Sequence, residues 1–167
     1  MSDITVRPAA VHEVPVILRF VRELARYERL EDQVVATEEG LRAALFGPRP
    51  YAEVALGCVD GEPVGFALFF HNFSTFLGRP GIYLEDLFVL PESRGRGIGR
   101  CLLEWLAALA MQRGCGRLEW AVLDWNEPSI GFYRSLGAVP MDQWTTFRLA
   151  GAALESLARS AGERTVR

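Results

Sequence analysis

The chain has 167 residues, of which half are hydrophobic and 23% are charged, and its formal net charge is −3. These values are typical of one globular domain that buries its own core, so we expect a single domain over residues 1–167. No apolar run approaches the roughly 18 residues of a membrane span. The acidic balance argues against a nucleic-acid partner and suits a cationic small molecule. Since no signal peptide is recognisable and three scattered cysteines lack metal-ligand spacing, we expect free thiols in the cytoplasm and no metal.

Helical and strand-like patterns alternate along the chain without repeats or linkers. Thr37 is a candidate helix N-cap, Asp60-Gly61 is typical of a tight hairpin, and Asn126 is a second candidate N-cap. In chain order, the predicted elements are a strand at Ile4–Arg7, a helix at Val14–Arg26, a helix from Thr37 to Gly47, strands at Tyr51–Val59, Pro63–Phe70 and Tyr83–Leu90, a helix from Ile98 to Gly114, a strand at Leu118–Trp125, a helix at Glu127–Leu136, a strand at Trp144–Leu149 and a terminal helix at Ala152–Ala161 within the tail 152–167.

The resulting order is β-α-α-β-β-β-α-β-α-β-α. An adjacent hairpin of strands followed by alternating helices and strands predicts a mixed, mostly antiparallel central sheet with helices on its faces. The fold class is therefore α/β (α+β).

A glycine-rich turn between a predicted strand and a predicted helix is the most informative segment. It reads Arg94-Gly-Arg-Gly-Ile-Gly-Arg100. Glycines leave backbone N–H groups accessible at the positive end of the helix, where a phosphate binds well. The glycine spacing does not fit G-x-G-x-x-G, and a P-loop requires a lysine, which this chain lacks. A plain strand-to-helix connector remains an alternative from the turn alone.

The pattern Arg94-x-x-Gly97-x-Gly99 resembles the pyrophosphate-binding motif of the GNAT superfamily of N-acetyltransferases. A second segment, from Asn126 through Ser129 and Phe132-Tyr133 to Gly137, resembles the acyl-CoA-binding helix of the same superfamily. Two motifs in the right order are far more specific than either one. Within the superfamily, the chain resembles the diamine (spermidine/spermine) and thialysine acetyltransferases over about residues 4–149 through further segments: Leu24–Glu28, Tyr83–Asp86 and Asp124–Ser129.

The resemblance implies acetyl-CoA as co-substrate, a small amine as acceptor, no metal and a homodimer. It places the donor on three groups of residues. The expected donor-binding residues are Leu87, Phe88 and Val89 of the strand, Arg94, Gly95, Arg96, Gly97, Ile98, Gly99 and Arg100 of the turn, and Asn126, Ser129 and Tyr133 of the later helix. A backbone N–H of Leu87 or Phe88 is the candidate donor to the oxyanion.

Two residues are expected to move protons. An ammonium group with a pKa near 10 must lose its proton before it attacks, and Glu85 in an apolar strand is the candidate base, acting through water. Tyr133 is the candidate acid for the departing thiolate. A solvated strand carboxylate and a packed aromatic are their respective alternatives. Strand alternation places Asp86 on the face opposite Glu85, with structural pairing as its expected role.

The amine is expected at Tyr27, Glu28, Glu85 and Asp142. The predicted function is direct acetyl transfer from acetyl-CoA to a primary amine of a small diamine or lysine-like molecule. Two alternatives stay open: an acetyltransferase for a protein amino group or an aminoglycoside, and a non-catalytic acyl-CoA-binding module.

Overall fold

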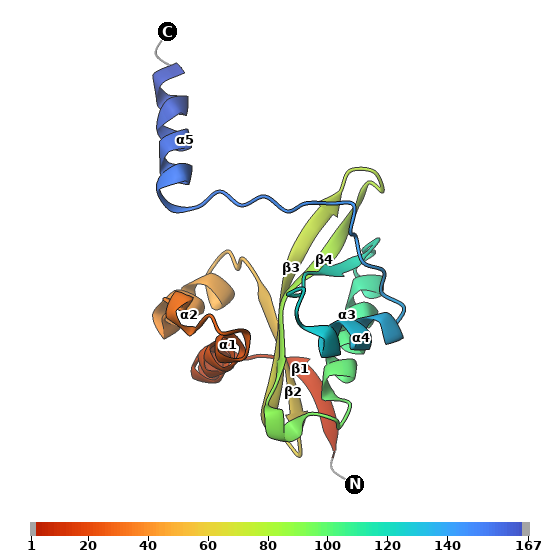
Figure 1. Ribbon diagram of the computed structural model, residues 1–167. Helices are drawn as coiled ribbons and strands as arrows, with labels where there is room; N and C mark the ends of the chain where they lie inside the picture. The colour runs from red at the N-terminus through yellow and green to blue at the C-terminus, as the bar shows by residue number, and fades with distance from the viewer. Residues whose placement is uncertain (1–2, 165–167) are drawn as a thin grey trace. The chain divides into compact units, whose positions relative to one another are not determined.

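The structure is a computed structural model that describes residues 3–164. The chain divides into two compact units, Met1–Ala121 and Val122–Arg167, which are described separately. The first unit holds the sheet and three α-helices (Figure 1). The second unit holds two further α-helices joined by an extended segment.

Within the described part of the chain, five strands form one sheet in the order β1-β2-β3-β4-β5. They are β1 (Ile4–Pro8), β2 (Glu53–Val59), β3 (Glu62–Ser74), β4 (Arg79–Val89) and β5 (Leu118–Trp120). Neighbouring strands are antiparallel except β4 and β5, which run parallel. A parallel pair needs a crossover connection, and the helix α3 (Ile98–Gln112) supplies it. This mixed sheet confirms the predicted fold class.

The β2–β3 hairpin forms where the sequence predicted it. Asp60 and Gly61 both have positive φ, at 50° and 88°, as a two-residue turn between twisted strands requires. The Asp60 carboxylate also accepts a hydrogen bond of 2.8 Å from the Asp3 N–H. The turn therefore fixes the register of β2 and β3 from local sequence.

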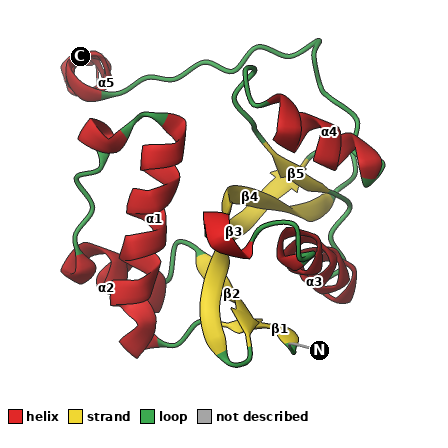
Figure 2. Ribbon diagram, turned by 60° about the horizontal axis from the view of Figure 1, so that its bottom comes forward, coloured by secondary structure: helices red, strands yellow, loops and turns green. Residues whose placement is uncertain are grey.

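Helices cover both faces of the sheet in the first unit (Figures 1 and 2). α1 (Val14–Glu28) and α2 (Glu38–Phe46) lie on one face, and α3 lies on the other. Thr37 caps α2 as predicted, because its side-chain oxygen accepts from the Gly40 N–H at 3.1 Å. Under α1, the rings of Phe20, Phe66 and Phe88 form a buried cluster. This aromatic cluster fixes α1 against β3 and β4.

The second unit begins with a turn and the helix α4 (Glu127–Ser135) and ends with α5 (Gly151–Arg164). The segment between these helices contains no strand, so the predicted strand at Trp144–Leu149 is wrong. A strand needs a neighbour to pair with, and Trp144 and Phe147 are 74% and 91% exposed. The predicted tail 152–167 is helical up to Arg164, and residues 165–167 lie outside the described part.

Among the remaining predicted boundaries, the largest differences are at the end of β5 and in the hairpin of β3 and β4. β5 ends at Trp120 rather than Trp125, because the chain turns at Leu123, whose carbonyl accepts from the Asn126 N–H. β4 begins at Arg79 instead of Tyr83, since the β3–β4 hairpin is longer than its apolar pattern indicated. Among the described residues, no helix is both long and apolar enough to cross a membrane.

Candidate active site

The regular alternation of side chains between the two faces of β4 is interrupted at Glu85. Cross-strand partners share a face, and the pairing joins Phe69 with Leu84 and Leu68 with Asp86. Phe69 packs against α3, whereas Leu68 packs against the cluster under α1. Leu84 and Asp86 therefore face opposite sides, although residues two apart in a regular strand share one. Glu85 is the extra residue of a β-bulge.

The bulge interrupts the strand alternation from which we expected Glu85 and Asp86 to lie on opposite faces. Asp86 is half-buried, and burial, followed by the negative charges of Glu85 and Glu28, raises its pKa from 3.8 to about 6. Among the residues whose side chains the structure describes, none forms an ion pair with Asp86, so the expected structural pairing is not observed. The pKa of Glu28 is also raised by burial. Glu28 and Asp86 are both half-buried, and their like charges repel each other.

Glu28, Glu85 and Asp86 thus form one carboxyl cluster at the end of α1 and the bulge of β4. Among the residues whose side chains the structure describes, none of the three carboxyls forms an ion pair with an arginine. Burial at a site of unbalanced charge is characteristic of functional carboxyls. The cluster is suited to bind a cation or accept a proton from one.

The outer edge of β4 beyond the bulge is open to an extended ligand. The Leu90 N–H donates to the Val64 carbonyl of β3, so by alternation the Phe88 amide also faces β3. Leu87 and Val89 direct their backbone groups to the opposite edge. β5 pairs with β4 only over Ile82–Leu84 and ends before the level of Leu87. Of the two candidate oxyanion donors, the geometry favours Leu87 over Phe88, which is 4% exposed and belongs to the core.

The glycine-rich turn has the conformation that an anion site needs. Gly95 and Gly97 have φ of 75° and 88°, and Gly97 is the N-cap of α3 without a side-chain hydrogen bond to the helix. The space beside both glycines is open to at least 4 Å. Ile98 is 1% exposed and anchors the turn against the sheet. The first N–H groups of α3, from Ile98 to Arg100, are therefore left for an outside acceptor.

The three arginines of the turn have different surroundings. Arg94 turns back onto the sheet, where its Nε donates to the Val89 carbonyl at 2.9 Å. The Nη1 of Arg100 lies 3.8 Å from the Oε1 of Glu104 on the next turn of α3. Arg96 is exposed and has no ion pair within the described residues. The three arginines thus differ in orientation, and their roles at a diphosphate stay predictions.

The second unit carries the other predicted donor-binding residues. Asn126 is 6% exposed and caps α4, because its Oδ1 accepts from the Ser129 N–H at 3.4 Å. Tyr133 lies on the same helix, half-buried, with its ring 5.4 Å from that of Phe132. Asp142 is exposed in the segment between α4 and α5. Their roles stay predictions.

The chain was compared with known proteins. Residues 18–138 match the acetyltransferase (GNAT) family. The chain belongs to this family. It is 41% identical to the thialysine N-epsilon-acetyltransferase of Bos taurus, over 95% of this chain and 99% of the relative. It is 31% identical to the L-ornithine N5-acetyltransferase of Arabidopsis thaliana, over 91% and 86% of the two chains.

Among solved structures, an integron cassette protein from the mobile metagenome of V. cholerae is similar, with a TM-score of 0.79 and 28% identity. The match covers 93% of this chain and 97% of the other. These similarities confirm the family identified from the two sequence motifs. This GNAT protein is an N-acetyltransferase, an enzyme that transfers an acetyl group to an amine.

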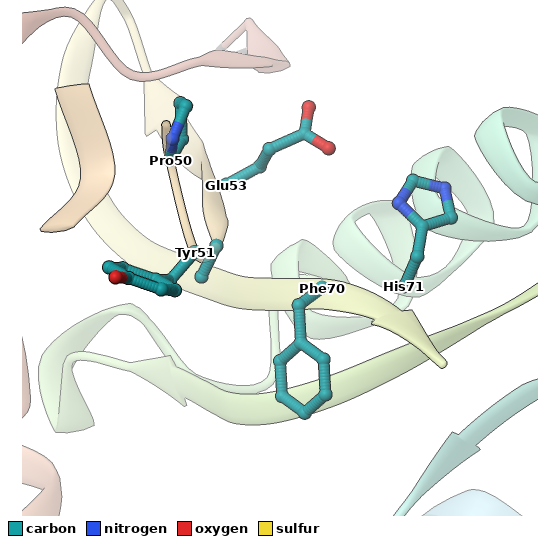
Figure 3. A pocket seen from close by; sticks show the side chains of 6 residues that line it. Pro50, Tyr51, Glu53, Phe70 and His71 are labelled. Atoms are coloured by element: carbon teal, nitrogen blue, oxygen red, sulfur yellow. The ribbon is translucent and has the colours of Figure 1, made fainter. Parts of the chain in front are cut away.

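A separate hollow of about 490 Å³ opens beside the start of β2 and contains none of the predicted site residues. In Figure 3, Phe70 and His71 leave β3 on opposite sides, as neighbours in a regular strand do. Glu53, which lines this hollow, forms an ion pair with Arg113. The lining residues are Pro50, Tyr51, Ala52, Glu53, Phe70 and His71.

The sequence indicated structural pairing for Asp86 and did not indicate its place beside Glu28. The signal was available, because two consecutive carboxyls in an otherwise apolar strand require either a charged partner or a local break in alternation. The structure shows the break, and it brings Asp86 to the same cluster as Glu28.

Proposed function

We propose that this GNAT enzyme transfers acetyl from acetyl-CoA to a primary amine of a small diamine or lysine-like substrate. The observation that carries the proposal is the position of the carboxyl cluster. Glu28, Glu85 and Asp86 lie beside the open edge of β4, and this edge leads directly into the glycine-rich turn at the start of α3. One continuous surface thus offers amide groups, an anion site and an acidic site.

The donor is bound by backbone groups in this proposal. The amides of Leu87 and Val89 on the open edge suit the amide groups of a pantetheine arm, and the N–H groups after Gly97 suit its diphosphate. Arg96 supplies positive charge beside that diphosphate. Asn126 and Ser129 orient the pantetheine arm at the start of α4.

Proton transfer is assigned to two side chains. Glu85 accepts the ammonium proton through water, which leaves a neutral amine to attack the thioester carbon. The Leu87 N–H donates to the oxygen on which negative charge develops. Tyr133 donates a proton to the thiolate as the carbon–sulfur bond breaks. No covalent enzyme intermediate is required.

The substrate class follows from charge. Thialysine and ornithine, in the names of the relatives, each carry a side-chain amine and a second amino group. A cation of this kind is stabilised by the cluster of Glu28, Glu85 and Asp86, with Tyr27 beside it and Asp142 as a further acidic residue. A second ammonium also offsets the burial and the like charges that raise the pKa of Asp86.

We further propose that both units form one acetyltransferase domain and that the enzyme acts in the cytoplasm as a homodimer. The family match crosses the boundary between the units. Three free cysteines suit a reducing compartment. Support for a dimer comes from the large exposed apolar side chains of the segment after α4, because such surfaces commonly meet a partner. These side chains belong to Val139, Met141, Trp144, Phe147 and Leu149.

A thiol-release assay with acetyl-CoA tests the activity across diamines, thialysine, ornithine, aminoglycosides and a lysine peptide. We expect turnover with the small amines and weak or no turnover with the others. Faster turnover of an aminoglycoside or of the peptide would show that the proposed class, small diamines and lysine-like amines, is wrong. Binding of CoA, seen as a rise in melting temperature without turnover of any amine, would instead show a non-catalytic module. Sedimentation velocity tests the dimer.

A further inference from the structure

Arg94 connects three parts of the site by contacts within the first unit. Its Nε donates to the Val89 carbonyl at 2.9 Å. The guanidinium carbon lies 4.8 Å from the centre of the Tyr27 ring at the end of α1, and 5.5 Å from that of Phe88. Both distances are within the range of a cation–π contact. Arg94 itself begins the glycine-rich turn, so it joins the turn, β4 and α1.

These contacts set the direction of the guanidinium. The Nε donor is used by the strand, and the guanidinium carbon lies over two aromatic rings. An arginine that bound a phosphate would present its donors as a fork to the phosphate oxygens. The neighbouring Arg96 makes no ion pair or cation–π contact with any residue whose side chain the structure describes, which makes it the better candidate for the diphosphate.

Arg94 does not act as the counter-ion of the carboxyl cluster. Among the residues whose side chains the structure describes, no ion pair joins Arg94 to Glu28, Glu85 or Asp86. The negative charge of the cluster is therefore not neutralised by Arg94. The Arg94 guanidinium contacts the ring of Tyr27, the residue before Glu28.

We propose that Arg94 is a positioning residue for the acceptor amine and not a ligand of the diphosphate. It holds the Tyr27 ring, and with it the end of α1 that carries Glu28, against β4. It also occupies the Val89 carbonyl, which leaves the Leu87 amide groups and the Val89 N–H for the donor. This inference rests on the proposed function, because it assigns Tyr27 and Glu28 to the amine.

The first test compares matched variants of two arginines in the same turn. With Arg94→Met, we expect KM for the amine, at saturating acetyl-CoA, to rise roughly five- to twentyfold from loss of a cation–π contact and a hydrogen bond. The Kd of CoA by titration calorimetry should stay within about twofold. Arg96→Met should show the reverse pattern, since one phosphate contact is removed. A loss of CoA affinity in Arg94→Met as large as in Arg96→Met would overturn the proposal.

Arg94→Lys separates charge from shape and is the variant to use should Arg94→Met fold poorly. Lysine keeps the positive charge at the turn but lacks the planar group and its Nε donor. We expect KM for the amine to rise in Arg94→Lys almost as much as in Arg94→Met. Full rescue of KM by lysine would show that only charge matters, and would contradict the positioning role.

A double-mutant cycle tests the link to Tyr27. Tyr27→Leu removes the ring, so it should raise KM for the amine in the wild-type background and add little in the Arg94→Met background. Effects that multiply in the double variant would show that the two residues act independently. The CoA titrations need no turnover, so they still test Arg94 if no amine is acetylated, which is the outcome that would refute the proposed function.

Discussion

Replacing Asp86 by asparagine should stabilise the protein in a pH-dependent way. Burial and two like charges raise the pKa of Asp86 from 3.8 to about 6, so its ionised form is unfavourable in the folded state. Each pKa unit corresponds to about 1.4 kcal/mol, which sets an upper limit of about 3 kcal/mol on this cost. Asparagine keeps the shape of the side chain and removes the charge. We therefore expect Asp86→Asn to raise the free energy of unfolding by about 1–3 kcal/mol at pH 7–8.

The sign of the pH dependence follows from linkage. Below pH 3.8 Asp86 is protonated in both the folded and the unfolded chain, and it carries no penalty. Between pH 3.8 and 6 the unfolded chain releases the proton first, so the free energy of unfolding falls as pH rises. Above pH 6 the penalty is complete and constant.

Urea unfolding of wild type and Asp86→Asn at each pH from 4 to 8 measures this difference. The two proteins should be about equally stable at pH 4 and diverge up to pH 6 or slightly above. A difference in unfolding free energy that is the same at every pH would refute the reasoning, since it would come from packing and not from charge. Glu85→Gln is the matched control: it removes one repelling charge from Asp86, so the region of divergence should move to lower pH.

Further predictions concern the other site residues and acid stability. Gly97→Asp should weaken CoA binding by charge repulsion and by strain at a φ of 88°, measured by calorimetry on the folded variant; unchanged affinity would refute the diphosphate assignment. Glu85→Gln should lose most rate at neutral pH and recover towards pH 10, where amines deprotonate in solution; a constant deficit would assign Glu85 to positioning. Tyr133→Phe should bind CoA normally but turn over roughly 10²–10⁴ times more slowly, and a few-fold effect would exclude it as the acid. Glu13 accepts two hydrogen bonds from Arg7, which with the Ala10 N–H hold its pKa at about 2 despite burial. The resulting stability should be complete above pH 4.5 and lost as pH falls towards 2, and Glu13→Gln should flatten that part of the stability profile.

Local signals made much of this fold predictable from sequence. Thr37 and Asp60-Gly61 act through neighbours one to three residues away, so their cap and turn form as expected. The strand expected at Trp144–Leu149 depended on a partner strand that an apolar pattern cannot specify. The bulge at Glu85 depends on pairing with β3, and the direction of Arg94 on the distant Tyr27. The sequence therefore indicates which residues are candidates for the site better than it indicates where their side chains point.

The extra residue in β4 also makes this strand sensitive to changes in length. Ile82 faces α3 and Phe88 faces the cluster under α1, and their core positions are compatible only because Glu85 shifts the phase between them. A deletion of three bases that removed Glu85 would force one half of the strand to turn over, sending either Ile82 or Phe88 out of its layer. An insertion beside Glu85 would do the same. The two sides of the core thus depend on the presence of a residue at position 85. We expect substitutions of Glu85 to be tolerated by the fold far better than its deletion.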